Sequence, residues 1–439
     1  MIEVKDIIDR KSVYALRYVL NGYVLEDFQT VDALTAIVRK VAVLSHDTGM
    51  GKTVIASAII KMLHNQDPNR KFLFVCKVAQ FIQTPKDLAR ATGLKVLAVS
   101  SKREDLENYI HSLEFVDYDI VVLAEEVFSD PAVVYTLRLT NALFTAIFID
   151  EAHEMTNYLE SDRAAMLKAL LPYYEYRFAL TATPMTTSLD QFSRLLQMLE
   201  PGQFKGRVVT LTNYLKSYSL ESDYPGLYIR RSRRDIGVPN LYENKIVFVD
   251  PMPDQVGVSG NGMFLKTKGP GALNQVNKLI EIIKEESETP QPLRRKGLVY
   301  IWRHEVREWV ESKFKEAGIK YACINGKTSR KNKRLYQEQF NKGELDVIIT
   351  SVTTSLNLDC DYVIFYEFTV DAKQFIGRSE RGLISKKIRI YYMFTKDTGE
   401  IEFFLHNIYE RSLVISSVLQ KDYNMLIRAA MEVKQLCLK

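Results

Sequence analysis

The nine residues 45–53, Ser-His-Asp-Thr-Gly-Met-Gly-Lys-Thr, have the types and spacing that bind the phosphates of a nucleotide. Gly49 and Gly51 let backbone N–H groups approach phosphate oxygens at places where a Cβ atom would intrude. The Lys52 ammonium can reach the β and γ phosphates, and the Thr53 hydroxyl can bind Mg²⁺. We therefore predict a site for ATP and Mg²⁺. Its expected ATP-binding residues are Thr48, Gly49, Met50, Gly51, Lys52 and Thr53.

The segments on either side of this loop support that interpretation. An apolar run over 41–44 predicts a buried strand before the loop, and an apolar helical pattern over 54–60 predicts a helix after it. The N-terminus of that helix would add partial positive charge to the site. The usual pattern Gly-x-x-x-x-Gly-Lys-Thr is incomplete, because His46 stands at the first glycine position. The alternative interpretation is an ordinary turn between a strand and a helix.

Two adjacent carboxylates follow another predicted strand. Asp150 and Glu151 come directly after the apolar run 146–149. Ligands of open α/β sheets bind at the carboxyl ends of the strands, so this is a suitable place for catalytic groups. We predict that Asp150 holds Mg²⁺ and that Glu151 orients and deprotonates the attacking water. The alternative is a pair of ordinary surface carboxylates.

Two arginines later in the chain are candidates for stabilising charge on the γ phosphate. Arg378 and Arg381 are three residues apart, so they share one face if the segment is helical. From the opposite side of a nucleotide cleft they would act as arginine fingers. The alternative is a solvated basic helix end in which Glu380 pairs with the arginines.

Short apolar runs separated by helical stretches predict the elements that position these groups. Such runs are typical of strands buried on both faces of a parallel sheet, and their alternation with helices indicates repeated βαβ units. The pattern occurs in two blocks, of which only the first has a phosphate loop, so we predict an α/β protein with two tandem parallel-sheet lobes and a nucleotide cleft between them. The predicted strands are 41–44, 72–76, 95–99, 120–124, 146–150 and 176–180 in the first block, and 297–301, 320–324, 346–350, 362–366 and 388–392 in the second.

Composition changes along the chain suggest five regions. A Gly- and Pro-rich stretch over 250–273 predicts a loop or insertion between the two blocks. The predicted regions are an N-terminal cap, 1–22; the ATP-binding lobe, 23–200; a helical and linker region, 201–290; the second lobe, 291–399; and C-terminal helices, 400–439.

The overall composition is that of a globular protein. The 439 residues are 46% hydrophobic and 26% charged, and the net charge of +5 permits nucleic-acid binding without indicating it. The four cysteines form no Cys-x-x-Cys pair, which argues against a zinc site and suggests reduced thiols in the cytoplasm. We find no apolar run of about 20 residues, so we expect no membrane partner.

Four motifs in a fixed order resemble those of superfamily 2 helicases and translocases. They are Gly-Lys-Thr at 51–53, Asp-Glu-Ala-His at 150–153, Thr-Ala-Thr-Pro at 181–184 and Gln-x-x-Gly-Arg-x-x-Arg at 374–381. Three further segments resemble the Swi/Snf-like branch: 25–29, whose Gln29 corresponds to an adenine-reading residue, the double arginine of 228–233, and 325–329 with the residues after it.

The resemblance implies two RecA-like lobes that couple ATP hydrolysis to movement on DNA. It also implies that His153, Thr181, Thr183 and Gln374 transmit hydrolysis to the DNA-facing side. For the threonines the alternative is a strand end stabilised by local hydroxyl bonds. The segment 350–358 lacks the glycines that the branch usually has there, and Gly382 is followed by Leu-Ile instead of Gln. With the compact length, these departures resemble phage or viral helicases of the branch-migration type, acting in the bacterial host cytoplasm.

The expected partner is duplex or branched DNA, held mainly through its phosphates. Basic clusters over 230–234, 294–296 and 331–334 would add attraction, although charge runs are often simply solvated faces. We expect a monomer. The alternatives are an RNA helicase, and an ATP-switch subunit of a repair or restriction complex that does not separate strands. The candidate DNA contacts are Lys77, Gln80, Arg303, His304, Lys327, Thr328, Thr350 and Thr353.

Overall fold

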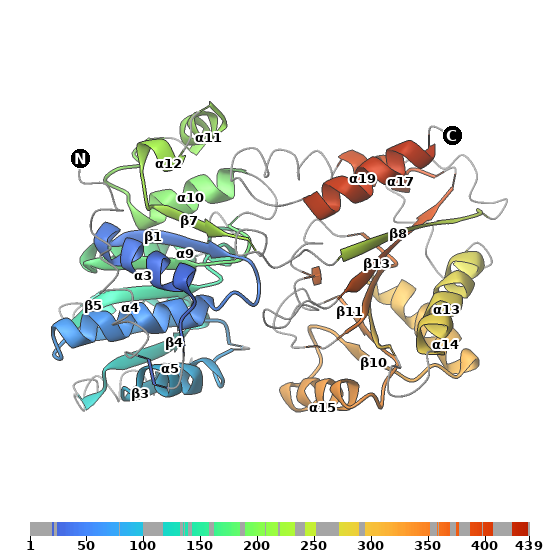
Figure 1. The fold of residues 1–439 in the computed structure, drawn as a ribbon, viewed down its shortest axis with the longest axis horizontal. Coiled ribbons are helices and arrows are strands. Elements are labelled where there is room, and N and C mark those ends of the chain that lie inside the picture. The colour runs from blue at the N-terminus through green and yellow to red at the C-terminus, as the bar shows by residue number, and fades with distance from the viewer. Residues whose placement is uncertain are drawn as a thin grey trace. The chain divides into compact units, whose positions relative to one another are not determined.

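The computed structural model divides into two compact units, Met1–Ser232 and Arg233–Lys439, and each is described by itself. Both are α/β units built on a parallel sheet, which confirms the predicted fold class (Figure 1). The residues described are 20–21, 24–78, 80–99, 117–131, 135, 137–138, 143–157, 162–184, 189–206, 208–217, 220–232, 242–251, 272–288, 295–351, 358, 360–368, 375–376, 387–396, 398–406 and 424–437.

The first unit is a seven-stranded parallel sheet of order β3-β4-β2-β5-β6-β1-β7. Its central strands are apolar and buried along almost their whole length, as the sequence predicts for strands covered on both faces. Because β5, β6 and β1 are neighbours, the loops that follow them meet at one edge of the sheet. The strands are β1 (Val41–His46), β2 (Lys71–Cys76), β3 (Val96–Val99), β4 (Ile120–Ala124), β5 (Phe144–Asp150), β6 (Tyr176–Leu180) and β7 (Tyr228–Arg231).

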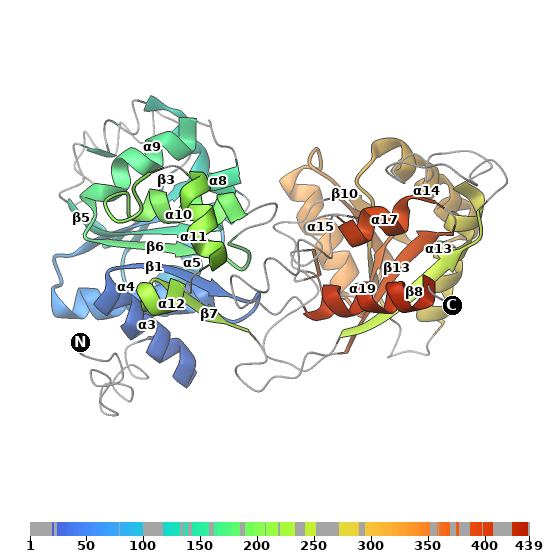
Figure 2. The ribbon, with the colours of Figure 1, turned by 90° about the horizontal axis from the view of Figure 1, so that it is seen from above.

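Helices cover both faces of this sheet. Figure 2 shows α3 and α4 on one face and α9 and α10 on the other. On the α3–α4 face, Ala36 and Ile59 pack against strand residues such as Leu44 and Phe148 in one apolar cluster. The helices of the unit are α3 (Asp27–Arg39), α4 (Lys52–Gln66), α5 (Thr84–Thr92), α8 (Glu154–Asn157), α9 (Asp162–Leu170), α10 (Leu189–Leu199), α11 (Val208–Ser217) and α12 (Leu220–Asp223), with 3-10 turns at Glu125–Ser129 and Leu171–Tyr173.

The second unit is a six-stranded parallel sheet of order β10-β11-β9-β12-β13-β8. Its core includes Val299 and Tyr362, and a Cβ atom at Gly297 would lie 1.9 Å from the Tyr362 ring, so only glycine fits there. The strands are β8 (Tyr242–Val249), β9 (Gly297–Tyr300), β10 (Tyr321–Ile324), β11 (Val347–Thr350), β12 (Tyr362–Phe365) and β13 (Ile388–Thr395); the helices are α13 (Leu273–Ser287), α14 (His304–Ala317), α15 (Arg330–Asn341), α17 (Glu400–Phe404) and α19 (Asn424–Cys437).

A buried carboxylate fastens α13 to the second sheet. Glu286 accepts hydrogen bonds from Arg295 at 3.1 Å, from Arg389 and from the Tyr391 hydroxyl. Burial alone would raise the pKa of Glu286, but the bonds from Tyr391, Arg389 and Arg295 bring it below its ordinary value. This carboxylate therefore stabilises the unit in its charged form.

All eleven predicted strands are present, but two further strands were not predicted. β7 and β8 both lie within the region 201–290, for which the sequence suggested helices and a linker. β7 pairs with β1 in the first sheet and β8 pairs with β13 in the second. The division into two compact units falls after Ser232, within the region 201–290, and strands of that region complete both sheets. None of the described helices is long and apolar enough to cross a membrane.

Candidate nucleotide-binding site

The loop between β1 and α4, predicted to bind phosphate, contains two glycines in a left-handed backbone conformation. Gly49 and Gly51 have φ angles of 81° and 79°, in the left-handed region that favours glycine. Lys52 is the first residue of α4, so the helix N-terminus lies at the loop. The Lys52 ammonium donates to the His46 carbonyl at 3.1 Å. Backbone N–H groups, a helix N-terminus and an ammonium are thus assembled in one turn.

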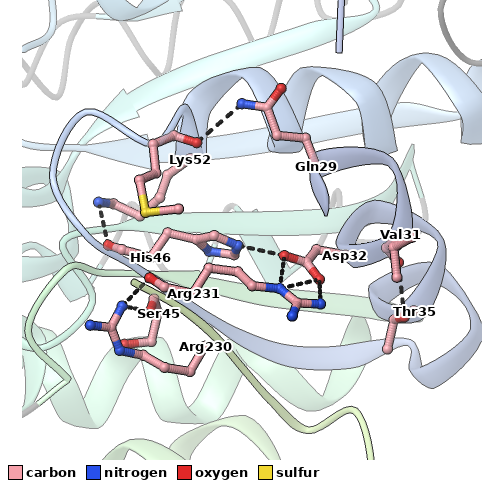
Figure 3. A network of polar contacts seen from close by, with 10 residues as sticks. Gln29, Val31, Asp32, Thr35, Ser45, His46, Lys52, Arg230 and Arg231 are labelled. Atoms are coloured by element: carbon pink, nitrogen blue, oxygen red, sulfur yellow. Dashed lines mark hydrogen bonds and ion pairs between the residues drawn. The ribbon is translucent and has the colours of Figure 1, made fainter. Parts of the chain in front are cut away.

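Gln29 reaches this loop from α3. Its side-chain amide donates to the Met50 carbonyl at 3.1 Å (Figure 3). Its side-chain oxygen accepts from the Glu26 backbone N–H at 3.0 Å. A Cβ atom at Gly51 would lie 2.4 Å from the Gln29 amide nitrogen, so the glycine also makes room for this side chain. The structure therefore brings the predicted adenine reader and the phosphate loop into direct contact.

The carboxylates lie at the end of β5. Asp150 is the last residue of the strand, and its Oδ1 accepts from the Glu151 backbone N–H at 3.0 Å. Glu151 adopts φ 49°, an uncommon conformation for a residue other than glycine and one that occurs at functional turns. Burial and the charge of Glu151 raise the pKa of Asp150 to about 7, and the nearby Lys52 opposes that rise. Because the charge of Lys52 lowers the pKa of Asp150, the carboxylates at the end of β5 interact electrostatically with the loop.

The residues around Asp150 fit a bound Mg²⁺. Burial makes the charged form of this carboxyl unfavourable, and a bound divalent cation would stabilise that charged form. Asp150 and Thr53 are the residues that would hold the ion, since carboxylate and hydroxyl oxygens are the ligands that Mg²⁺ prefers. Glu151, next in the chain, is equally buried.

Three of the four predicted coupling residues form one hydrogen-bonded group. The His153 Nδ1 atom lies 2.8 Å from the Thr181 hydroxyl, which also accepts from the Thr183 backbone N–H at 3.0 Å. The same Nδ1 atom lies 3.5 Å from a Glu151 carboxylate oxygen. The loops after β5 and β6 are thus joined beside Glu151. Gln374, Arg378 and Arg381 lie outside the described residues.

The predicted DNA contacts have varied surroundings. Lys77 is 5% exposed and pairs with Glu154, and the Arg303 side chain donates to Glu367. Thr350 is buried, Gln80 and Thr328 are half-buried, and His304 and Lys327 are exposed. Thr353 lies outside the described residues. The exposed pair, both in the second unit, are the candidates most accessible to a phosphate backbone.

Sequence reasoning missed Asp32. This buried aspartate lies on α3, one turn after Gln29, and contacts His46 and Arg231 (Figure 3). Its partners are 14 and 199 residues away in sequence, so no local pattern could have indicated the contacts.

Comparisons with known proteins match both units. Residues 34–222 match the SNF2-related domain and residues 274–383 match the helicase conserved C-terminal domain. Protein CHROMATIN REMODELING 5 of Arabidopsis thaliana is 25% identical over 230 residues, 48% of this chain and 13% of that protein. The human DNA repair and recombination protein RAD54B is 24% identical over 221 residues, 48% of this chain and 23% of that protein. The chain thus covers less than a quarter of either relative.

Solved structures also match this chain, and one of them is matched over most of its length. It is the Sulfolobus solfataricus SWI2/SNF2 ATPase core in complex with dsDNA, with a TM-score of 0.44 and 17% identity over 95% of this chain and 97% of that one.

Proposed function

Because this chain belongs to the Snf2-like family of superfamily 2 helicases, we propose that it is an ATP-driven motor that moves along DNA. The observation that supports this most strongly is the convergence in one unit of the Gly49–Thr53 loop, the base-side residue Gln29 and the carboxylates Asp150 and Glu151. Phosphate binding, base recognition and water activation are the three tasks that ATP hydrolysis requires.

Each residue has a chemical role in this proposal. Lys52 binds the β and γ phosphates, and Glu151 orients the water and accepts its proton. Mg²⁺ held by Thr53 and Asp150 would neutralise phosphate charge. The buried setting of Glu151 strengthens its electrostatic effect, because little water competes there.

Coupling to movement uses the hydrogen bonds beside Glu151. His153 contacts both Glu151 and Thr181, so a change in the carboxylate after hydrolysis shifts the loop after β6. We assign Gln374 to the same coupling, and Arg378 and Arg381 to stabilising charge on the γ phosphate. A cleft between the units that closes on ATP and reopens after hydrolysis completes the cycle.

The proposed partner is DNA, and the finer proposal is work on branched DNA in replication, recombination or repair. We propose that His304 and Lys327, which are exposed, contact phosphates of the DNA. One relative is named as a DNA repair and recombination protein, which supports the finer proposal. From the departures at 350–358 and after Gly382, we also propose a phage or viral enzyme that acts as a monomer in a bacterial host cytoplasm.

The test compares ATP hydrolysis without nucleic acid and with duplex DNA, single-stranded DNA, a four-way junction and RNA. We expect stimulation by DNA, greatest with the junction, and loss of turnover in Lys52→Ala and Glu151→Gln. Full turnover in either variant would refute the assigned site. Stimulation by RNA alone would favour an RNA helicase. Slow hydrolysis without displacement of a triplex-forming strand would favour an ATP-switch subunit.

A further inference from the structure

The three residues that enter the phosphate loop, 45–47, form hydrogen bonds with α3 and β7. Figure 3 shows the bonds of Ser45 and His46. We propose that Asp32 and Arg231 are positioning residues of the nucleotide site, which fix the His46 carbonyl on which the Lys52 ammonium rests. This inference depends on the proposed function, because it assigns the two residues to ATP binding through Lys52.

The first contact fixes the side chain of His46. Its Nε2 atom lies 2.8 Å from an Asp32 carboxylate oxygen, and both side chains are at most 1% exposed. Burial lowers the pKa of His46, so the ring is neutral and Nε2–H donates to the carboxylate. In water-free surroundings such a bond to a charged acceptor is strong and directional. The residue at the first glycine position is therefore fixed by α3.

The second contact joins Asp32 to β7. The Arg231 guanidinium donates to both carboxylate oxygens of Asp32, with Nε at 3.1 Å from each and a terminal nitrogen at 2.8 Å from one. This fork geometry is specific to arginine, since lysine offers only a point charge. Asp32 thus receives hydrogen bonds from His46 and from β7 at once.

Arg230 on β7 holds the residues on either side of His46, and we refer to Asp32, Arg230 and Arg231 together as the clamp. The Arg230 guanidinium donates to the Ser45 carbonyl at 2.8 Å and to the Asp47 carboxylate at 2.7 Å. The Asp47 backbone N–H donates to the Arg231 carbonyl at 3.1 Å. Residues 45, 46 and 47 are therefore each bonded to β7, to α3 or to both.

The clamp positions Lys52, the residue proposed to bind the β and γ phosphates. The Lys52 ammonium donates to the His46 carbonyl, whose position depends on Asp32. A preorganised lysine loses less conformational entropy when a triphosphate binds, so the clamp increases affinity for phosphate without touching the ligand. Gln29, which lies on the same helix, serves the base side separately through Met50.

The position of β7 in the chain adds a consequence. Arg231 is the last residue of β7, and the first unit ends at the next residue, Ser232. The covalent connection to the second unit therefore leaves directly from the clamp. A change at the phosphate loop reaches that connection through Asp32 and the two arginines.

A double-mutant cycle tests whether Asp32 acts through Lys52. The affinities for ATP and for AMP are measured by calorimetry with Asp32→Asn in the wild-type and in the Lys52→Ala background. We expect Asp32→Asn to weaken ATP binding about tenfold in the first background and less than about twofold in the second. Binding of AMP, which has no β or γ phosphate, should change less than about twofold. Arg231→Lys should behave like Asp32→Asn, because it removes the fork.

Glu200→Gln is the matched control. Glu200 accepts two hydrogen bonds from Arg39, the last residue of α3, and among the described contacts this pair has none with residues 45–47. This variant should bind ATP and AMP like the wild type.

Three results would overturn the inference. An equal loss of ATP affinity in both backgrounds would mean that Asp32 only stabilises the fold. Unchanged ATP binding in both Asp32→Asn and Arg231→Lys would remove the positioning role while leaving the proposed function intact. Unchanged ATP binding in Lys52→Ala alone would overturn the inference together with the proposed site.

Discussion

Replacing Asp150 with asparagine should stabilise the first unit at neutral and alkaline pH, although it removes a predicted Mg²⁺ ligand. Folding raises the pKa of this carboxyl from 3.8 to about 7 through burial and the charge of Glu151. The stability that such a group contributes is fully present below the unfolded pKa and is lost as pH rises through the folded pKa. Asparagine carries no charge at any pH, so the variant avoids this loss.

The size of the effect follows from the pKa difference. One pKa unit corresponds to about 1.4 kcal/mol, so the loss above pH 8 is at most about 4 kcal/mol. At pH 5 the carboxyl is mostly charged in the unfolded chain alone, and the loss is less than half of that at pH 8. Asparagine keeps an Oδ1 atom to accept the 3.0 Å bond from the Glu151 N–H. In a unit of this size, about 4 kcal/mol corresponds to about 10 °C in melting temperature.

The assay is thermal unfolding in EDTA between pH 4 and pH 9, followed by circular dichroism. Both tryptophans, Trp302 and Trp309, belong to the second unit, so their fluorescence is an internal control that the substitution should not alter. We expect the melting temperature of the first unit in Asp150→Asn to exceed the wild-type value by a margin that grows up to about pH 7 and is constant above pH 8.

Glu286→Gln is a control, because its effect on stability should depend on pH in the opposite direction. The pKa of Glu286 is lowered in the fold, so its stabilising effect is present at neutral pH and is lost as the pH falls. In this variant the second unit should have a lower melting temperature than in the wild type at pH 8, and the difference should be smaller at acidic pH. A benefit of Asp150→Asn that is the same at pH 4 and pH 8, or a loss of stability at pH 8, would refute the reasoning.

Three further substitutions have direct readouts. Gly51→Ala places a Cβ atom 2.4 Å from the Gln29 amide on a backbone with φ +79°, so ATP should bind about tenfold more weakly in calorimetry, with less discrimination against GTP. Gly297→Ala should destabilise the second unit by about 3 kcal/mol in urea unfolding followed by tryptophan fluorescence, because its Cβ overlaps the Tyr362 ring. Lys327→Ala should reduce the salt dependence of DNA affinity by about 0.9 in log–log slope, and an unchanged slope would exclude a phosphate contact.

The buried strands and the phosphate loop could be predicted because their signals are local. A strand covered on both faces, such as β4, must be apolar throughout, and a loop that binds phosphate needs glycines before Lys-Thr. β8 was missed because its first half includes Glu243 and Lys245, which leaves only the short apolar run 246–249, and because its residues are mostly half-exposed. β7 has only four residues and ends in two arginines, a pattern that indicates no strand by itself.

The neighbours of the site residues could not be predicted, because they are distant in sequence. Lys77 follows β2 and carries the charge expected of a phosphate contact, but the fold pairs it with Glu154, 77 residues later. Arg231 belongs to a basic run that suggested DNA binding, yet its guanidinium is bonded to Asp32. Long-range pairs of this kind depend on strand order, which the sequence pattern leaves open.

The charges on β8 bear on how copies of this protein meet one another. β8 is the outermost strand of its sheet, and outermost strands have backbone groups available to pair with another molecule. Glu243 on this strand forms ion pairs with Lys245 at 2.6 Å and with Lys387 at 2.8 Å. If a strand of a second chain paired with this edge, these charged side chains would lose contact with water, which is unfavourable in free energy. The same charges that hid β8 from pattern recognition therefore oppose aggregation through that edge.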